Sequence, residues 1–72
     1  MKKILEIEDM NTLQIGAAIM RIFEGMHGVD DVKLDLEDES ITIEFARGAL
    51  TEDELCDAVN SEGFEVTSIY DA

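Results

Sequence analysis

The side chains of this sequence that could do chemistry are mostly carboxylates. The chain has 72 residues, of which 18 are acidic and 5 are basic, so its formal net charge at pH 7 is −13. Asp35, Glu37, Asp38 and Glu39 form the densest group of acids. Such oxygen ligands suit hard cations such as Ca²⁺, but a specific loop also needs a glycine and alternating ligands, which this segment lacks. The sequence therefore favours a solvated acidic turn with at most weak, nonspecific cation binding.

Residues that could act as a nucleophile or a base are few. His27 is the only histidine and Cys56 the only cysteine. Nucleophilic catalysis needs a nucleophile and a base within hydrogen-bond reach, and neither Ser40 nor Ser61 has a base nearby in the sequence. Acidic residues surround Cys56, and no cation is placed to lower its pKa, so we interpret it as a packing residue. The chain is predicted not to be an enzyme and to need no cofactor.

The charge limits the kinds of partner. Nucleic-acid binding needs clustered Lys and Arg, and anionic membrane surfaces repel a surface of this sign. We therefore predict no nucleic-acid partner and no membrane partner. Basic protein surfaces and cations are electrostatically favoured. A salt-rich cytoplasm would also select an acidic, lysine-poor surface, and composition does not separate these two explanations.

Composition also limits the cellular compartments in which the chain is expected. A single cysteine cannot form an internal disulfide, and no stretch approaches the ~18 apolar residues of a membrane span. Glu6 and Glu8 interrupt the apolar segment that a signal peptide would need. We expect a cytoplasmic protein that forms a single domain over residues 1–72.

The first part of the chain alternates between the periods of a strand and a helix. Residues 4–8 are expected to form a strand with Leu5 and Ile7 facing inward. Asn11 offers a helix cap, and Gln14 completes a pattern like a capping box. Apolar residues then recur at the helical period; they are Ile15, Ala18, Ile19, Ile22, Phe23 and Met26.

A hairpin is predicted after this helix. Gly28 is expected to close the helix in the left-handed conformation. Residues of alternating polarity then flank an acidic turn at 37–40, which indicates two paired strands. The inward residues of the hairpin are predicted to be Val32, Leu34, Leu36, Ile41, Ile43 and Phe45.

A second helix is marked most clearly at its start. Thr51 and Glu54 match a capping box, and Leu50 and Leu55 match the hydrophobic staple that accompanies it. This helix is expected to stop at Gly63. The last strand is predicted to contain Phe64, Val66 and Ile69.

This order of elements predicts an α+β fold. A βαββαβ chain most simply forms a ferredoxin-like two-layer sandwich, with a four-stranded antiparallel sheet and two helices on one face. The other face of the sheet is then expected to be polar and solvated. Its residues are predicted to be Glu6, Glu8, Lys33, Asp35, Thr42 and Glu44.

The layout resembles the heavy-metal-associated domain family, which includes small copper chaperones and N-terminal domains of metal-transporting ATPases. In that family a G-M-T-C-x-x-C motif joins the first strand to the first helix. Residues 9–15 (Asp-Met-Asn-Thr-Leu-Gln-Ile) fall on this motif, and residues 26–29 and 62–64 fall on two later turns. The resemblance covers essentially the whole chain and implies the ferredoxin-like fold.

The chain departs from the family pattern at the metal ligands. The family binds soft ions such as Cu(I) through two thiolates, and Thr12 and Ile15 occupy those two positions here. Isoleucine cannot ligate a metal, and a threonine hydroxyl is a poor ligand for Cu(I). Asp9 also replaces the motif's glycine, and Cys56 is expected on the second helix, away from this loop. The resemblance therefore implies a degenerate motif with no metal site.

Two hypotheses for function follow. The first is a small acidic domain of the metal-trafficking type that has lost its thiolate site and acts as a protein-binding or regulatory module. The alternative is a functional heavy-metal binding or transfer protein that uses a different site or ligands from a partner. The resemblance implies a partner with a basic surface, such as a domain of a metal transporter, docked at the end that carries the first loop. The predicted contact residues are Asp9, Asn11, Thr12, Glu62 and Phe64, with Phe64 as an exposed aromatic among acids.

Overall fold

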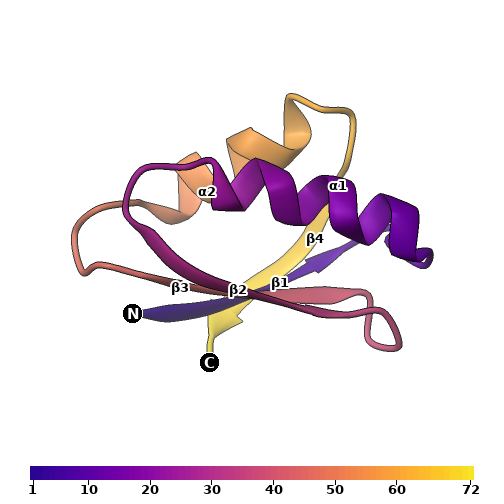
Figure 1. The fold of residues 1–72 in the computed structure, drawn as a ribbon, viewed down its shortest axis with the longest axis horizontal. Coiled ribbons are helices and arrows are strands. Elements are labelled where there is room, and N and C mark those ends of the chain that lie inside the picture. The colour runs from indigo at the N-terminus through magenta and orange to yellow at the C-terminus, as the bar shows by residue number, and fades with distance from the viewer.

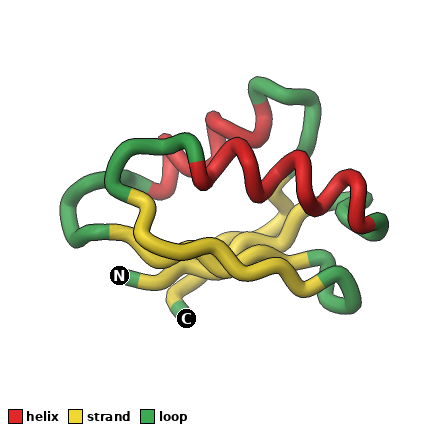
Figure 2. Tube along the Cα trace, viewed as in Figure 1, coloured by secondary structure: helices red, strands yellow, loops and turns green.

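The computed structural model describes residues 1–72 and contains four strands and two helices. The elements are β1 (Lys2–Ile7), α1 (Leu13–Glu24), β2 (Val29–Asp35), β3 (Ser40–Phe45), α2 (Glu52–Asn60) and β4 (Val66–Asp71). The strands form one antiparallel sheet of order β2-β3-β1-β4. Both helices cover the same face of this sheet (Figures 1 and 2). The predicted ferredoxin-like fold is therefore confirmed.

The hydrophobic core lies between the sheet and the helices. Alternate residues of β1 and β3 point into it, as the period-two pattern predicts. Each helix contributes one apolar stripe, and neither helix is long and apolar enough to cross a membrane. The buried core residues are Leu5, Ile7, Met10, Ile19, Phe23, Val32, Ile41, Ile43, Phe45, Leu55 and Val59.

The start of α1 differs from the prediction by one residue. Thr12, not Asn11, is the N-cap, and its Oγ1 accepts a hydrogen bond from the backbone N–H of Ile15 at 3.2 Å. Asn11 instead belongs to a tight turn, where its N–H donates to the carbonyl of Asp9 at 2.9 Å. Asp9 has a φ of 65°, the left-handed conformation that turns the chain here. The predicted capping pattern of Asn11 with Gln14 is therefore wrong.

The end of α1 also differs. The helix ends at Glu24, and its C-cap is Gly25 with a φ of −81°, so the prediction that Gly28 caps the helix is wrong. Gly28 does have a positive φ of 95°, but it lies in the turn before β2. A Cβ at Gly28 would lie 2.7 Å from the Cβ of Ala49, so this turn needs glycine for space as well as conformation.

The buried stripe of α1 is rotated from the predicted one. Ala18 is exposed, whereas Gly16 is buried. A Cβ at Gly16 would lie 2.6 Å from Cδ2 of Leu34, so the absence of a side chain lets α1 approach β2 closely. Leu36 was predicted to lie on a strand; it is a half-buried residue of the turn that follows Asp35.

The start of α2 agrees with the prediction. Thr51 Oγ1 accepts from the N–H of Glu54 at 3.2 Å, and Glu54 Oε1 accepts from the N–H of Thr51 at 3.0 Å, which completes the capping box. Lys3 Nζ lies 2.8 Å from the Glu52 carboxylate and also pairs with Asp71. Hydrogen bonds to Asp71 and then to Glu52 raise the pKa of Lys3. The first turn of α2 is thereby tied to both β1 and β4.

The uncovered face of the sheet is polar apart from one cross-strand pair. Ile4 on β1 lies opposite Tyr70 on β4, and the Tyr70 side chain is exposed. Glu8, which we predicted on this face, lies in the turn beyond the end of β1.

Candidate functional site

Three connections meet at one end of the molecule. They are the β1–α1 loop (residues 8–12), the β2–β3 turn (36–39) and the α2–β4 connection (61–65). The N–H of Ile7 donates to the carbonyl of Glu39 at 2.9 Å, and the N–H of Glu8 donates to the carbonyl of Glu65 at 2.9 Å. These bonds hold the three connections together, and we call this region the loop end.

The two positions of the metal motif have structural roles here. The hydroxyl of Thr12 caps α1, as described above, and Thr12 is exposed to solvent. Ile15 is half-buried and packs against the hydrophobic core. Met10, the motif's methionine, is fully buried. None of these side chains offers the pair of thiolates that a soft metal ion requires.

Leu13 is the most exposed large apolar residue of the chain, with 68% of its surface accessible. It occupies the first position of α1, between the cap residue Thr12 and exposed Gln14. The sequence patterns do not single out Leu13, because it lies outside the inward stripe of the helix and between the motif positions Thr12 and Ile15. The available signal was that Leu13 is apolar but precedes that stripe.

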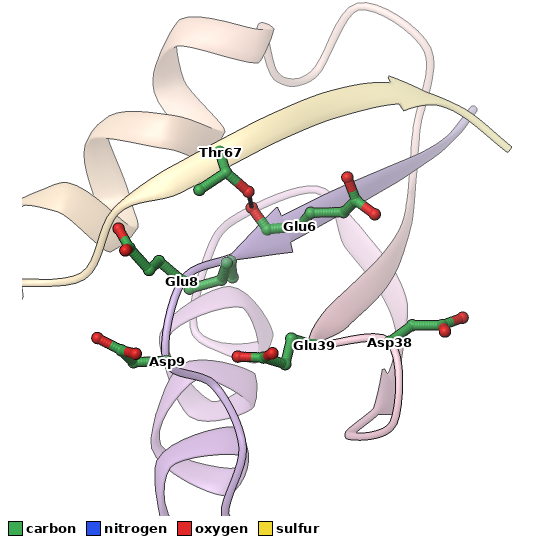
Figure 3. Close-up of a pocket in the computed structure, with 7 residues that line it drawn as sticks. Glu6, Glu8, Asp9, Asp38, Glu39 and Thr67 are labelled. Atoms are coloured by element: carbon green, nitrogen blue, oxygen red, sulfur yellow. Dashed lines mark hydrogen bonds between the residues drawn. The ribbon is translucent and has the colours of Figure 1, made fainter.

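Carboxylates surround a hollow of about 350 Å³ at the loop end. The hollow is lined by Glu6, Ile7, Glu8, Asp9, Asp38, Glu39 and Thr67. Figure 3 shows the side chains of Glu8, Asp9 and Glu39 around it, with Asp38 turned outward. No group of three or more His, Cys, Asp or Glu residues is arranged to hold a metal ion.

Glu8 has the most perturbed carboxyl group of the loop end. A hydrogen bond with the Glu65 side chain, followed by the charges of Glu65 and Asp9, raises the pKa of Glu8 above its ordinary value. A slight loss of solvation and the charge of Glu39 act in the same direction. Glu65 is 57 positions away along the chain, so the sequence analysis had no local pattern from which to pair it with Glu8.

The predicted contact residues all lie at the loop end. Asp9 and Phe64 line a second hollow of about 350 Å³ with Ile15 and other residues, so the fold brings these two together. Phe64 is half-buried against the core and precedes β4, which corrects the prediction of an exposed aromatic on the last strand. Asn11, Thr12 and Glu62 are exposed on the same connections.

His27 and Cys56 lie outside this region. His27 is exposed in the α1–β2 turn, at the opposite end of the molecule from the β2–β3 turn (Figure 1). Cys56 is half-buried on α2. Burial, followed by the charges of Asp53, Glu52 and Asp57, raises the pKa of the Cys56 thiol, which disfavours the reactive thiolate.

Comparison with solved structures identifies close matches in fold. The chain is similar to the CopZ metallochaperone, with a TM-score of 0.86 and 19% identity over 93% of this chain and 100% of that one. It is similar to oxidised MerP from Ralstonia metallidurans CH34, with a TM-score of 0.84 and 16% identity over 94% and 97% of the two chains. A third match is the N-terminal domain of a potential copper-translocating P-type ATPase from Bacillus subtilis, with a TM-score of 0.82 and 20% identity over 99% and 91%.

Comparison of sequences, unlike comparison of structures, finds no match for this chain. No protein-family model matches the chain, and no curated protein matches it. At 15–21% identity, the structural matches establish the fold and leave the activity to be argued from the residues. The chain therefore has the ferredoxin-like fold of these metal-binding domains and a single cysteine, which lies away from the loop end.

Proposed function

We propose that this protein is a protein-binding module with a metallochaperone-type fold, and that it docks on a basic partner surface through its loop end. The observation that carries the proposal is the use of the two motif positions. Thr12 caps a helix and Ile15 packs on the core, so both side chains serve the fold instead of a metal. Leu13, which directly follows the loop end, and the loop-end carboxylates are then available for contact with another protein.

Leu13 supports the docking role. Burying an exposed apolar side chain in a partner's pocket removes apolar surface from water, which stabilises a complex. The carboxylates of Glu8, Asp9 and Glu39 lie at the same end of the molecule and favour a partner of opposite charge. A partner with Lys or Arg residues around an apolar pocket fits this combination. The fold likeness to an ATPase domain makes a metal-transporter domain the first partner to test.

Competition for Cu(I) tests the first half of the proposal. The purified protein is mixed with Cu(I) and a chelator of moderate strength, and the metal that each retains is measured. We expect all of the Cu(I) to remain with the chelator, because the motif has no thiols. Tight, stoichiometric uptake by the protein would instead support a metal-carrying function. Loss of that uptake in Cys56→Ser would identify the ligand.

Binding kinetics with a partner test the second half. A candidate transporter domain is immobilised, and association and dissociation rates are measured for wild type and variants. Leu13→Ala should increase the dissociation rate at least tenfold, whereas Glu62→Lys should slow association. Asp30→Lys, the same charge change outside the three loop-end connections, is the matched control and should have a smaller effect on association. Equal effects of both charge reversals and no effect of Leu13→Ala would place the interface elsewhere.

A further inference from the structure

The two edge strands of the sheet differ in how they discourage further pairing. β2 alternates charged with apolar residues, and its register shifts between Val29 and Asp31. Charges and bulges on an edge strand hinder the addition of another strand. The β2 edge is protected by both devices; its charged residues are Asp30, Asp31, Lys33 and Asp35.

The β4 edge lacks this protection over most of its length. Its sequence is Val-Thr-Ser-Ile-Tyr-Asp, and its only charged residue, Asp71, pairs with Lys3 of the same sheet. The one irregularity lies near the start, where the hydroxyl of Thr67 donates to the carbonyl of Glu6 at 3.2 Å (Figure 3). From Ser68 onward, β4 pairs regularly with β1, and Ile69 and Tyr70 are residues of high β-propensity.

The ladder with β1 indicates which backbone groups of β4 point outward. The N–H of Ala72 donates to the carbonyl of Lys2 at 3.2 Å. Bonded pairs alternate in an antiparallel ladder, so Tyr70 also bonds to β1. Ile69 and Asp71 then direct their N–H and C=O groups away from β1, on the side where this chain has no further strand.

We propose that an extended, cationic segment of a partner protein pairs with β4 and adds a fifth strand to the sheet. Glu65 precedes β4, and Asp71, which is paired with Lys3, ends it. The attraction for a cationic segment therefore comes from Glu65 and from the net charge of −13 on the chain. Half-buried Ile69 and exposed Tyr70 point to opposite faces and offer apolar contacts to alternate side chains of the segment. Apart from Glu65, which belongs to both, this edge is distinct from the loop end, and the proposal does not depend on the function proposed above.

Charge also decides between a partner segment and a second copy of this chain. Antiparallel pairing of two β4 strands would place Glu65 of one copy close to Asp71 of the other, and like charges across strands destabilise a pair. Each copy also carries a net charge of −13. A segment rich in Lys meets neither penalty, which is why the cationic segment is the occupant of this edge.

A synthetic peptide of ten alternating Lys and Val residues is the probe. It is titrated into ¹⁵N-labelled protein, and hydrogen exchange is followed at each amide. We expect the exchange of the Ile69 and Asp71 amides to slow at least tenfold. The same peptide with N-methyl groups on every second residue keeps its charge, but one of its two edges can no longer donate backbone hydrogen bonds. It should not protect these amides. If both peptides instead slowed exchange equally, and mainly at the amides of Glu8, Asp9 and Glu39, the proposal would be overturned.

Two protein variants give a second test. Asp71→Pro and Asp71→Asn both remove the carboxylate that pairs with Lys3, but only proline also removes the outward N–H. We expect Asp71→Pro to bind the peptide at least tenfold more weakly than Asp71→Asn. Equal affinities would contradict edge pairing. Sedimentation of the wild-type protein should show a monomer, and a dimer with slowly exchanging Ile69 and Asp71 amides would show that a second copy is the occupant.

Discussion

The two helices begin with threonine caps, but the surroundings of the two caps differ. α2 has a complete capping box, three acids in its first turn and an ion pair from Glu52 to Lys3. α1 has a single cap bond from Thr12, no acid in its first turn and an exposed leucine as its first residue. Acids near a helix N-terminus stabilise it through the helix dipole. The start of α2 thus has more local stabilising contacts than the start of α1, which exposes an apolar residue instead.

Introducing thiols at the two motif positions should produce the largest difference between the two helix starts. Thr12→Cys with Ile15→Cys places two thiols at a three-residue offset beside a helix N-terminus, which lowers their pKa. The double variant should be less stable without metal by ~1–2 kcal/mol, because Ile15 packs on the core. Cu(I) at about 1,000 times its dissociation constant should then stabilise it by ~4 kcal/mol. Thermal unfolding with and without Cu(I) measures both effects.

The matched control places the same pair at the other helix start. Thr51→Cys with Glu54→Cys has the same spacing, but Glu52 and Asp53 remain beside the thiols and disfavour thiolates. We expect weaker Cu(I) stabilisation there. Equal stabilisation at both sites would mean that the spacing of the two thiols alone determines how strongly Cu(I) binds. A folded Thr12→Cys, Ile15→Cys protein that ignores Cu(I) would show that the Asp9–Asn11 turn gives the loop a shape unsuited to the metal.

Removing each cap should have the next largest effect. Thr51→Ala is expected to cost ~1–2 kcal/mol of unfolding free energy, because it breaks a capping box, and Thr12→Ala ~0.5–1 kcal/mol. Urea unfolding of both variants measures the difference. Serine at each position keeps the capping oxygen and should restore most of the loss. A larger loss at Thr12 than at Thr51 would refute the comparison.

Charge removal should act with opposite signs near the two helix starts. Glu8→Gln relieves repulsion from Glu65, Asp9 and Glu39, so it should raise the melting temperature at pH 7. Glu52→Gln removes a partner of Lys3 and should lower the melting temperature. Both shifts should be smaller than those of the cap variants. Differential scanning calorimetry at low salt gives the two values, and shifts of the same sign would contradict the assignment.

The pH dependence of stability follows from the raised pKa of Glu8. The folded state binds the Glu8 proton more tightly than the unfolded state, so this group destabilises the fold at neutral pH. The contribution of Glu8 to stability should therefore rise as the pH falls through the raised pKa toward the ordinary value of 4.5, below which both states are protonated. The difference between wild type and Glu8→Gln should shrink over the same pH range. A constant difference would show that Glu8 does not titrate there.

Cys56 should give the smallest effect. Because burial and acids of α2 raise the pKa of its thiol, alkylation by iodoacetamide at pH 7.5 should be slower in the folded protein than in urea. Asp53→Asn should accelerate the folded-state reaction modestly, since the Asp53 charge is the second cause of the shift. Mass spectrometry over time measures the rates, and faster alkylation of the folded protein would contradict the assignment.

The sequence was sufficient to predict the elements whose signals lie within a few neighbouring residues. The capping box of Thr51 and Glu54 and the alternation along β3 were predicted directly, and together with the helical periodicity they fixed the order of elements. Asn11 and Thr12 are both acceptable caps, and the φ of Asp9 decides between them. Gly16 and Ala18 both suit a helix, and the approach of Leu34 decides which one is buried. Backbone conformation and distant contacts made these choices, and no local pattern encodes them.

The same limit applied to the candidate site. Asp9, Asn11 and Thr12 could be selected because they fall on a contiguous motif. The Glu8–Glu65 pair depends on the packing of two distant connections, and the exposure of Leu13 depends on where the helix begins. Phe64 lies at the end of the molecule where it was predicted, but its burial depends on packing against the hydrophobic core, which only the folded chain forms.

The position of β1 inside the sheet has a consequence for how the chain folds during synthesis. β1 is made first, yet its neighbours are β3 and β4, with Lys3 opposite both Ile43 and Asp71. Both sides of the first strand therefore stay unpaired until distant segments emerge, and contacts of such long sequence separation slow folding. A nascent chain that ends before β4 leaves one edge of β1 unpaired. Unpaired apolar strand edges favour aggregation, so we expect aggregation to be most favoured in the interval before the last strand emerges.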